Sequence, residues 1–186
     1  MKTIKNRIAL LVTMLMIATS AAVAAPKTSS EANASNHQVA GKVRHELVTL
    51  PFYGVFDNLA YKIDGSTVTL YGQVVRPTTR SDAARRVERI IGVTNVVNNI
   101  EVLPLSSFDD NLRLRTYRSV FNTSGLYRYA MGANPSLHIV VNNGHVSLEG
   151  VVANKMDSQL AYFAANSVPG VFSVTNNLRV ENEKAR

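Results

Sequence analysis

The 186-residue chain contains no cysteine. This absence excludes disulfides, thiolate metal sites and the lipid-modified N-terminal cysteine of a lipoprotein. The sequence also lacks an apolar run as long as a transmembrane helix requires, because its best candidate extends only from Ile8 to Ile17. The chain is therefore expected to fold without disulfides and to carry no lipid on an N-terminal cysteine.

Catalytic and metal-binding patterns are also missing. The four histidines are His37, His45, His138 and His145, and no pair has the helical spacing of a zinc site. There is no G-x-S-x-G nucleophile motif and no phosphate-binding loop of the Walker type. The acidic pair Asp109-Asp110 is better placed to begin a helix than to act as an acid and base. We predict no catalytic residue, no metal and no cofactor.

The N-terminus has the three parts of a secretory signal peptide. Basic residues Lys2, Lys5 and Arg7 flank the apolar run, which is followed by small residues ending in Ala22-Val23-Ala24. We predict cleavage after Ala24 and export; the alternative is an uncleaved anchor. Removal of three of the 20 basic residues leaves 17 against 13 acidic ones, a net charge of +4. Such a mild excess does not indicate a nucleic-acid partner.

The rest of the chain contains one module twice. An alignment without gaps of residues 59–102 with residues 137–180 gives 12 identities in 44 positions. Each copy has an amphipathic helix, a hairpin around a turn (Asp64-Gly65 or Asn143-Gly144), a second helix and a last strand. The fold class predicted is α+β, as two tandem α-β-β-α-β modules, each a mixed three-stranded sheet with two helices on one face.

The signal peptide, the repeat and the regions between them divide the chain into six segments. They are a signal peptide (1–24), a flexible polar leader (25–36), the first module (37–103), a linker (104–107), the second module (108–182) and a tail (183–186). Because a module of this length buries only about 60% of its unfolded surface, each core is thin. We therefore expect the two modules to support one another.

Three pairs of identical residues are predicted to define the fold, and they are Gly72 and Gly150, Gly92 and Gly170, and Asn98 and Asn176. The first pair lies on a buried strand face, where we expect it to let a helix approach closely. The second pair suits the left-handed residue that ends a helix. For the asparagines we favour a bulge or a bond from side chain to backbone over a ligand site.

The repeated pattern resembles the BON domain family. The resemblance rests on V-x-L-x-G-x-V in both hairpins (residues 68–74 and 146–152) and on G-V-x-x-V-x-N-x-[IL]-x-V in both last strands (residues 92–102 and 170–180). It implies a bacterial envelope protein of the periplasm that binds phospholipid or other envelope surfaces without catalysis. The missing cysteine separates the chain from the lipoprotein members.

Two basic or aromatic segments are candidate binding surfaces. The second helix of the first module carries a basic stripe of Arg80, Arg85, Arg86 and Arg89, which is either a solvated helix face or a surface for anionic head groups. The loop around residues 127–129 combines Tyr127, Arg128 and Tyr129, which suits a lipid interface. The alternative for this loop is that it folds over a thin core.

The second helix of the second module is apolar nearly all round, because Leu160, Tyr162 and Phe163 stand where the first copy has Asp82, Ala84 and Arg85. A helix of this kind needs cover on two faces, so we expect this face to meet the first module or an external ligand. The preferred hypothesis is binding of an anionic membrane surface or another envelope component, which supports envelope integrity under stress. The alternative is a protein-interaction or holdase-like module for a periplasmic client. The oligomeric state is left open.

Overall fold

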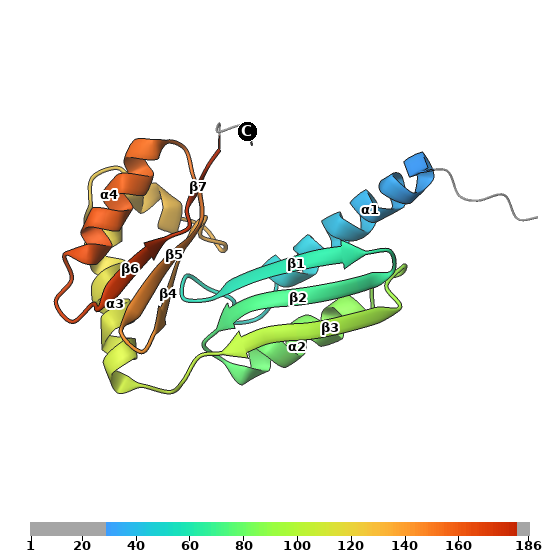
Figure 1. Cartoon of the computed structure of the whole chain (residues 1–186), viewed down its shortest axis with the longest axis horizontal. Coiled ribbons are helices and arrows are strands. Elements are labelled where there is room, and N and C mark those ends of the chain that lie inside the picture. Colours follow the sequence, from blue (N-terminus) through green and yellow to red (C-terminus); the bar gives the residue numbers. More distant parts are fainter. Residues whose placement is uncertain (1–28, 182–186) are drawn as a thin grey trace, which may run out of the picture.

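The computed structural model describes residues 29–181. The predicted signal peptide and the tail at residues 183–186 lie outside this range. In the first module the order is α1 (Ser29–Val48), β1 (Asn58–Asp64), β2 (Thr67–Val74), α2 (Pro77–Glu88) and β3 (Asn95–Val102). In the second it is α3 (Ser107–Asn122), a 3₁₀ helix η1 (Leu126–Ala130), β4 (Leu137–Asn142), β5 (His145–Val152), α4 (Lys155–Asn166), β6 (Ser173–Asn176) and β7 (Arg179–Val180). The α+β order is confirmed for both modules (Figure 1).

Each module contains one mixed sheet. In the first, β2 pairs antiparallel with β1 and parallel with β3, so that Leu70 lies beside Tyr61 and Asn98. In the second, β5 pairs antiparallel with β4 and parallel with both β6 and β7, which are two pieces of the last strand. Figure 1 shows the two helices of the first module together on one face of its sheet. Parallel pairing of consecutive strands requires such a helical crossover.

The core of the first module lies between this sheet and its helices. From α1 the buried residues are Val39, Val43 and Leu47, the stripe that the helical spacing predicts. They meet Val68 and Leu70 of β2, which are fully buried. Alternate residues of the same strand, such as Tyr71, lie on the open face of the sheet.

Helix α1 begins earlier than we expected. It starts at Ser29, within the segment 25–36 that was predicted to be a flexible leader. The prediction relied on the lack of an apolar period there and neglected intrinsic propensity, because Glu31, Ala32 and Ala34 are good helix formers. The helix therefore extends beyond the part that packs on the sheet.

The expectation that Gly72 and Gly150 admit a helix was wrong. A Cβ at Gly72 would lie 2.0 Å from the carbonyl oxygen of Asn58, and one at Gly150 would lie 2.1 Å from that of Ser136. Both oxygens belong to the residue at or just before the start of the neighbouring strand. The glycines have φ of +117° and +114°, a region that residues with a Cβ rarely adopt, and the missing Cβ leaves room for the carbonyl of the paired strand.

The modules join where the loop at residues 51–57 reaches β4. The amide of Ile139 donates to the carbonyl of Val55 at 2.7 Å, and His138 Nδ1 lies 3.2 Å from the carbonyl oxygen of Gly54. Phe56 packs edge-on against Tyr117 of α3, with 6.1 Å between ring centroids. The first module thus caps the free edge of the second sheet.

Strand β4 is consequently buried on both faces. Leu137, Ile139 and Val141 face the core of the second module, whereas His138 and Val140 lie on the other face, 8% and 2% exposed. The mutual support that we expected comes from this strand and not from α4. Two aromatic residues of the loop, Tyr53 and Phe56, serve the junction, and Tyr53 lies 5.5 Å from the His138 ring.

Candidate functional site

The arginine stripe of α2 is partly neutralised by neighbouring carboxylates. Arg85 pairs with Asp82 on the same helix. Arg86 Nη1 lies 3.3 Å from Glu46 of α1 and from Thr49 Oγ1. Arg80 and Arg89 are exposed, and neither forms an ion pair with another described residue. Two of the four arginines in the stripe, Arg85 and Arg86, therefore have their charge balanced by a neighbouring carboxylate.

The loop around η1 is held to its own module by a hydrogen-bonded cluster. Tyr129 is 7% exposed, and its hydroxyl donates to Asp157 and accepts from the Ala153 amide. Arg128 also donates to Asp157, which is buried at the first turn of α4. These contacts support the alternative of a loop folded over the core for Arg128 and Tyr129. Tyr127 is 63% exposed and remains accessible.

Of the extra apolar residues of helix α4, only Phe163 is presented to solvent. Phe163 is 65% exposed, while Leu160 and Tyr162 are half-buried. The helix packs on α3 and on the sheet of its own module, and Ser119 Oγ of α3 donates to the Ala164 carbonyl at 2.7 Å. We expected this face to meet either the first module or an external ligand. Among the described residues, the first module does not cover it.

An exposed aromatic pair lies at the hairpin end of the second module. The rings of Phe108 and Phe172 are stacked with centroids 6.0 Å apart, and they are 43% and 68% exposed. Phe172 also lies over the hairpin turn, because a Cβ at Gly144 would be 2.6 Å from its ring. Sequence reasoning missed this pair.

A signal for this pair was present in the comparison of the two copies. Phe172 occupies the position of Thr94, whose hydroxyl bonds Ser66 Oγ at 2.7 Å in the first module. A polar contact between turn and strand is thus replaced by an exposed ring. Divergence between the copies at this position marks a surface that the fold itself does not require.

Arginines of α3 adjoin this pair. Arg115 and Phe108 both approach Gly170, each within 3.6 Å of where its Cβ would be. Arg115 and Arg118 are exposed, and neither forms an ion pair among residues 36–181. Because Ser119 bonds to Ala164, this side of α3 adjoins the exposed face of α4. We define the module 2 helical surface as the set Phe108, Arg115, Arg118, Leu160, Phe163 and Phe172.

The two paired asparagines are structural. Asn98 Nδ2 donates to the Arg80 carbonyl at 3.0 Å, and Asn98 Oδ1 accepts from the Ile100 amide at 3.2 Å. Asn176 makes the same two kinds of bond, to the Ser158 carbonyl and the Leu178 amide. Each side chain therefore ties the last strand to the helix that crosses over it, and the alternative of a side-chain bond to backbone is the one observed.

The glycines at the ends of the second helices have the conformation predicted for them. Gly92 has φ of +102° and Gly170 has φ of +93°. Residues other than glycine rarely adopt a positive φ of this kind. Glycine adopts it readily and so lets the chain turn from helix to strand. Both positions serve the fold.

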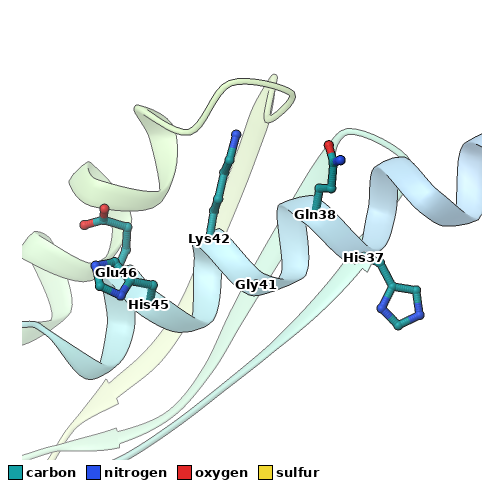
Figure 2. Close-up of a pocket in the computed structure, with 6 residues that line it drawn as sticks. All are labelled: His37, Gln38, Gly41, Lys42, His45 and Glu46. Carbon is teal, nitrogen blue, oxygen red and sulfur yellow. The ribbon is translucent and has the colours of Figure 1, made fainter.

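A groove of about 550 Å³ runs along the solvent side of α1 and is lined by His37, Gln38, Gly41, Lys42, His45 and Glu46 (Figure 2). Figure 2 shows the His37 ring pointing away from Gln38 and Lys42. His37 and His45 are two helical turns apart, about 12 Å along the axis, so they cannot share one ion. Nor does the described part of the chain contain a cluster of three His, Asp or Glu side chains fit for a metal.

Comparison with known families identifies the class of protein. The sequence profile of the BON domain matches residues 36–104 and 128–182, which together make up more than half of the chain. The chain belongs to the BON domain family, with two domains. BON domains occur in membrane- and phospholipid-related envelope proteins, many of them periplasmic, and are in general non-catalytic. No helix within residues 29–181 has both the length and the apolar character needed to cross a bilayer.

The two domain matches differ in extent. The first includes the described helix α1 from residue 36 onward, whereas the second begins at residue 128, after α3. Helix α3 nevertheless takes the place of α1 in the second module. The family match in this module therefore does not extend over α3.

Solved structures of low similarity were also found. One is the C-terminal domain of CdsD, the structural protein of the type III secretion system of Chlamydia trachomatis, with 11% identity and a TM-score of 0.32. The match covers 75% of this chain and 96% of that one. A second structure of CdsD gives 11% identity and a TM-score of 0.30, over 78% and 94% of the two chains. No curated protein matches the sequence.

Proposed function

We propose that the chain is an exported, periplasmic protein that binds anionic phospholipid surfaces of the envelope through the module 2 helical surface and supports envelope integrity. The observation that carries this proposal is the exposed Phe108–Phe172 pair beside Arg115. Aromatic rings enter the interfacial region of a bilayer, and arginine stems lie along the apolar boundary with their charge in the head groups.

The arrangement favours lipid over a purely aqueous partner. Each arginine near an anionic surface contributes about 1 kcal/mol, which salt screens. The apolar contribution of Phe108, Phe172 and Phe163 does not depend on salt, since it comes from burial of ring surface. Because binding combines this electrostatic contribution with the apolar one, it should weaken as the ionic strength rises but should not vanish.

Co-sedimentation of the full chain with vesicles tests the proposal. We expect strong binding to phosphatidylglycerol vesicles and weaker, residual binding to phosphatidylcholine vesicles, to which only the apolar contribution applies. Phe172→Ser and Arg115→Glu should each weaken binding at least about tenfold, because each removes one of the two contributions. Ile91→Ser and Arg85→Glu are matched controls, since Ile91 is 86% exposed on the first module and Arg85 is already paired with Asp82.

The controls also decide between the two modules. Loss of binding on Arg85→Glu, with Phe172→Ser unaffected, would move the lipid surface to α2, where the sequence first suggested it. A chain that sediments with neither kind of vesicle, at low salt and with its fold intact, rules out lipid binding.

A second candidate function is docking of a periplasmic protein client. It is favoured by Phe163, a large apolar side chain that is 65% exposed on a helix. A holdase-like module should suppress aggregation of an unfolding test protein in the absence of lipid. Phe163→Ser should abolish that effect, whereas suppression that survives the substitution removes the support for this candidate.

A further inference from the structure

A cleft of about 390 Å³ lies where the first module meets the open face of the second sheet. Sites for small molecules usually have volumes of about 300–1,000 Å³, so this cleft is large enough to hold a ligand. The first module contributes a residue of β2, and the second module contributes β4, β5 and the turn between them. We define the inter-module cleft as the set Gln73, Val140, Asn142, Asn143, His145 and Ser147.

The amide side chains of the inter-module cleft are held in place and keep free hydrogen-bonding atoms. Gln73 Nε2 donates to the Glu101 carboxylate at 2.7 Å. Asn143 Nδ2 donates to Asn142 Oδ1 at 3.0 Å. The other polar atoms, Gln73 Oε1, Asn142 Nδ2 and Asn143 Oδ1, form no hydrogen bond with another described residue. The cleft therefore offers a ligand two carbonyl acceptors and one amide donor.

Strand β5 adds two groups that can either donate or accept. His145 Nδ1 lies 2.7 Å from Ser173 Oγ, which leaves His145 Nε2 available. Ser147 is half-buried, and its hydroxyl forms no side-chain hydrogen bond within residues 36–181. The tautomer of an imidazole and the rotation of a hydroxyl adjust to the partner. These two groups therefore suit a ligand whose own groups both donate and accept.

The turn that carries the two asparagines is fixed by α3. Asp109 is fully buried and accepts hydrogen bonds from the amides of Asn143 at 2.8 Å and Gly144 at 2.9 Å. Arg113 Nη2 donates to the Val141 carbonyl at 2.9 Å. The side chains of the cleft are thus positioned before a ligand arrives, which lowers the entropic cost of binding.

Tyr71 supplies an aromatic surface beside the inter-module cleft. It lies two residues from Gln73 on the same face of β2, a separation of about 7 Å. Its neighbours on the adjacent strands are Ala60 and Asn99, which are short, and the tyrosine is 40% exposed. The ring is therefore accessible to a ligand that extends out of the cleft.

The charges around the inter-module cleft narrow the class of ligand. The lining includes no lysine or arginine, and the nearest charged partner of a lining side chain is the exposed carboxylate of Glu101. A phosphate or carboxylate ligand would find no cation to pair with there. A sugar needs none, because its hydroxyls both donate and accept, and its C–H face stacks on aromatic rings.

We propose that the inter-module cleft, with Tyr71 at its rim, binds an uncharged saccharide. The amide, imidazole and hydroxyl groups of the cleft bind the sugar hydroxyls, and the Tyr71 ring packs against the apolar face of a neighbouring sugar unit. The site needs both modules, since Gln73 and Tyr71 come from the first and the other polar groups from the second. It requires no lipid and does not depend on the module 2 helical surface.

An NMR titration of the isotope-labelled full chain without lipid tests the proposal. The probes are maltotriose, cellotriose and triacetylchitotriose, three uncharged trisaccharides. At least one should give saturable shifts with a Kd on the order of 1 mM, as expected for a few exposed hydrogen bonds and one ring contact. The largest shifts should be those of the side-chain amide signals of Gln73, Asn142 and Asn143, which locate the sugar without any substitution.

Substitutions in the first module and in β5 provide a second test. Gln73→Ala and Ser147→Ala should each weaken sugar binding about two- to tenfold by loss of one hydrogen bond, and Tyr71→Ser should do the same by loss of ring contact. Asn95→Ala is the control for the amide, because Asn95 is exposed on the same face at the other end of the sheet. Tyr127→Ser is the control for the ring, since Tyr127 is 63% exposed on the second module.

Circular dichroism checks that each variant folds, and vesicle binding by Gln73→Ala should equal that of wild type. Loss of sugar binding with vesicle binding intact therefore separates this proposal from the proposed lipid surface. Absence of saturable shifts with all three sugars overturns the inference. Binding that leaves the amide signals of the cleft unmoved, or that the two controls weaken as much as the cleft variants do, overturns it as well.

Discussion

Gly72 and Gly150 each leave room for a backbone carbonyl that no Cβ tolerates. The distances of 2.0 and 2.1 Å to Asn58 and Ser136 are far below van der Waals contact, and the neighbour in both cases is main chain. Main chain in a paired strand cannot move aside as a flexible side chain can. The requirement for glycine is therefore set by the hairpin itself, in both modules.

Gly72→Ala should destabilise the first module by about 3 kcal/mol, from the positive φ and the clash together. The matched control is Gly41→Ala, because Gly41 lies in α1 with nothing within 4 Å of its would-be Cβ. That change should stabilise the chain by about 0.5–1 kcal/mol through helix propensity. Urea unfolding followed by circular dichroism measures both, and equal stability of the two variants would contradict the assignment.

The asparagines Asn98 and Asn176 act at the scale of whole elements. Each joins the last strand of its module to the preceding helix, at 3.0 and 3.1 Å from the helix carbonyls of Arg80 and Ser158. The thin core between helix and sheet makes such a bond important, because few apolar contacts fix the angle of the helix. The duplication of the bond explains why the residue is shared by the two copies.

Asn98→Ala should lower the free energy of unfolding by about 1–2 kcal/mol, through loss of two bonds to backbone groups. Asn99→Ala is the control at the adjacent position, where the side chain lies on the open face of the same strand and is exposed. Its change should stay within about 0.5 kcal/mol. The two variants are compared in one series of denaturant titrations, and a larger loss for Asn99 would remove Asn98 from this role.

The elements were predictable because their patterns are local. The α-β-β-α-β order follows from periodicity and from turns such as Asp64-Gly65, and the core stripe Val39, Val43 and Leu47 follows from helical spacing. Which groups meet across the chain was not predictable. Arg128 and Tyr129 suited either a lipid-facing loop or a loop folded over the core. Their partner Asp157 lies some thirty residues away in sequence, and only the fold brings it near.

Prediction of the candidate site was limited for the same reason. Phe163 was found because it stands out on its own helix, whereas Phe108 and Phe172 come from separate segments and pair only in three dimensions. The α2 arginines form a stripe in sequence, but the partner Glu46 of Arg86 belongs to another helix. Charge patterning therefore located basic residues without showing which of them are neutralised.

The two modules form one molecule through β4 and the loop at residues 51–57. The buried His138 and Asp57 lie at this junction, and Asp57 binds the amides of Gly54 and Val75 at 3.0 and 2.7 Å. Burial lowers the pKa of His138 and raises the pKa of Asp57. The two groups also act on each other, since Asp57 raises the pKa of His138 and His138 lowers the pKa of Asp57. Glu149 and Arg113 shift the pKa of His138 and of Asp57 in the same respective directions.

The junction should therefore weaken on mild acidification. Because the pKa of His138 is lower in the folded chain than the usual 6.5, the unfolded chain binds the proton first. Stability falls as the pH drops through about 6.5 and toward the folded value. Asp57 has the opposite sign, since its raised pKa makes proton uptake favour the folded chain, and Asp57→Asn removes that opposing contribution.

Thermal unfolding of the full chain between about pH 8 and pH 6, on either side of the usual histidine pKa, measures this dependence. Wild type should lose more of its Tm over this range than His138→Gln, which keeps hydrogen-bonding groups but cannot take a charge. His145→Gln is the matched control, because His145 is exposed on the adjacent strand. Equal loss of Tm in wild type and His138→Gln would show either that the imidazole takes up its proton equally in the folded and unfolded chains or that the junction does not limit unfolding. Either result contradicts the prediction.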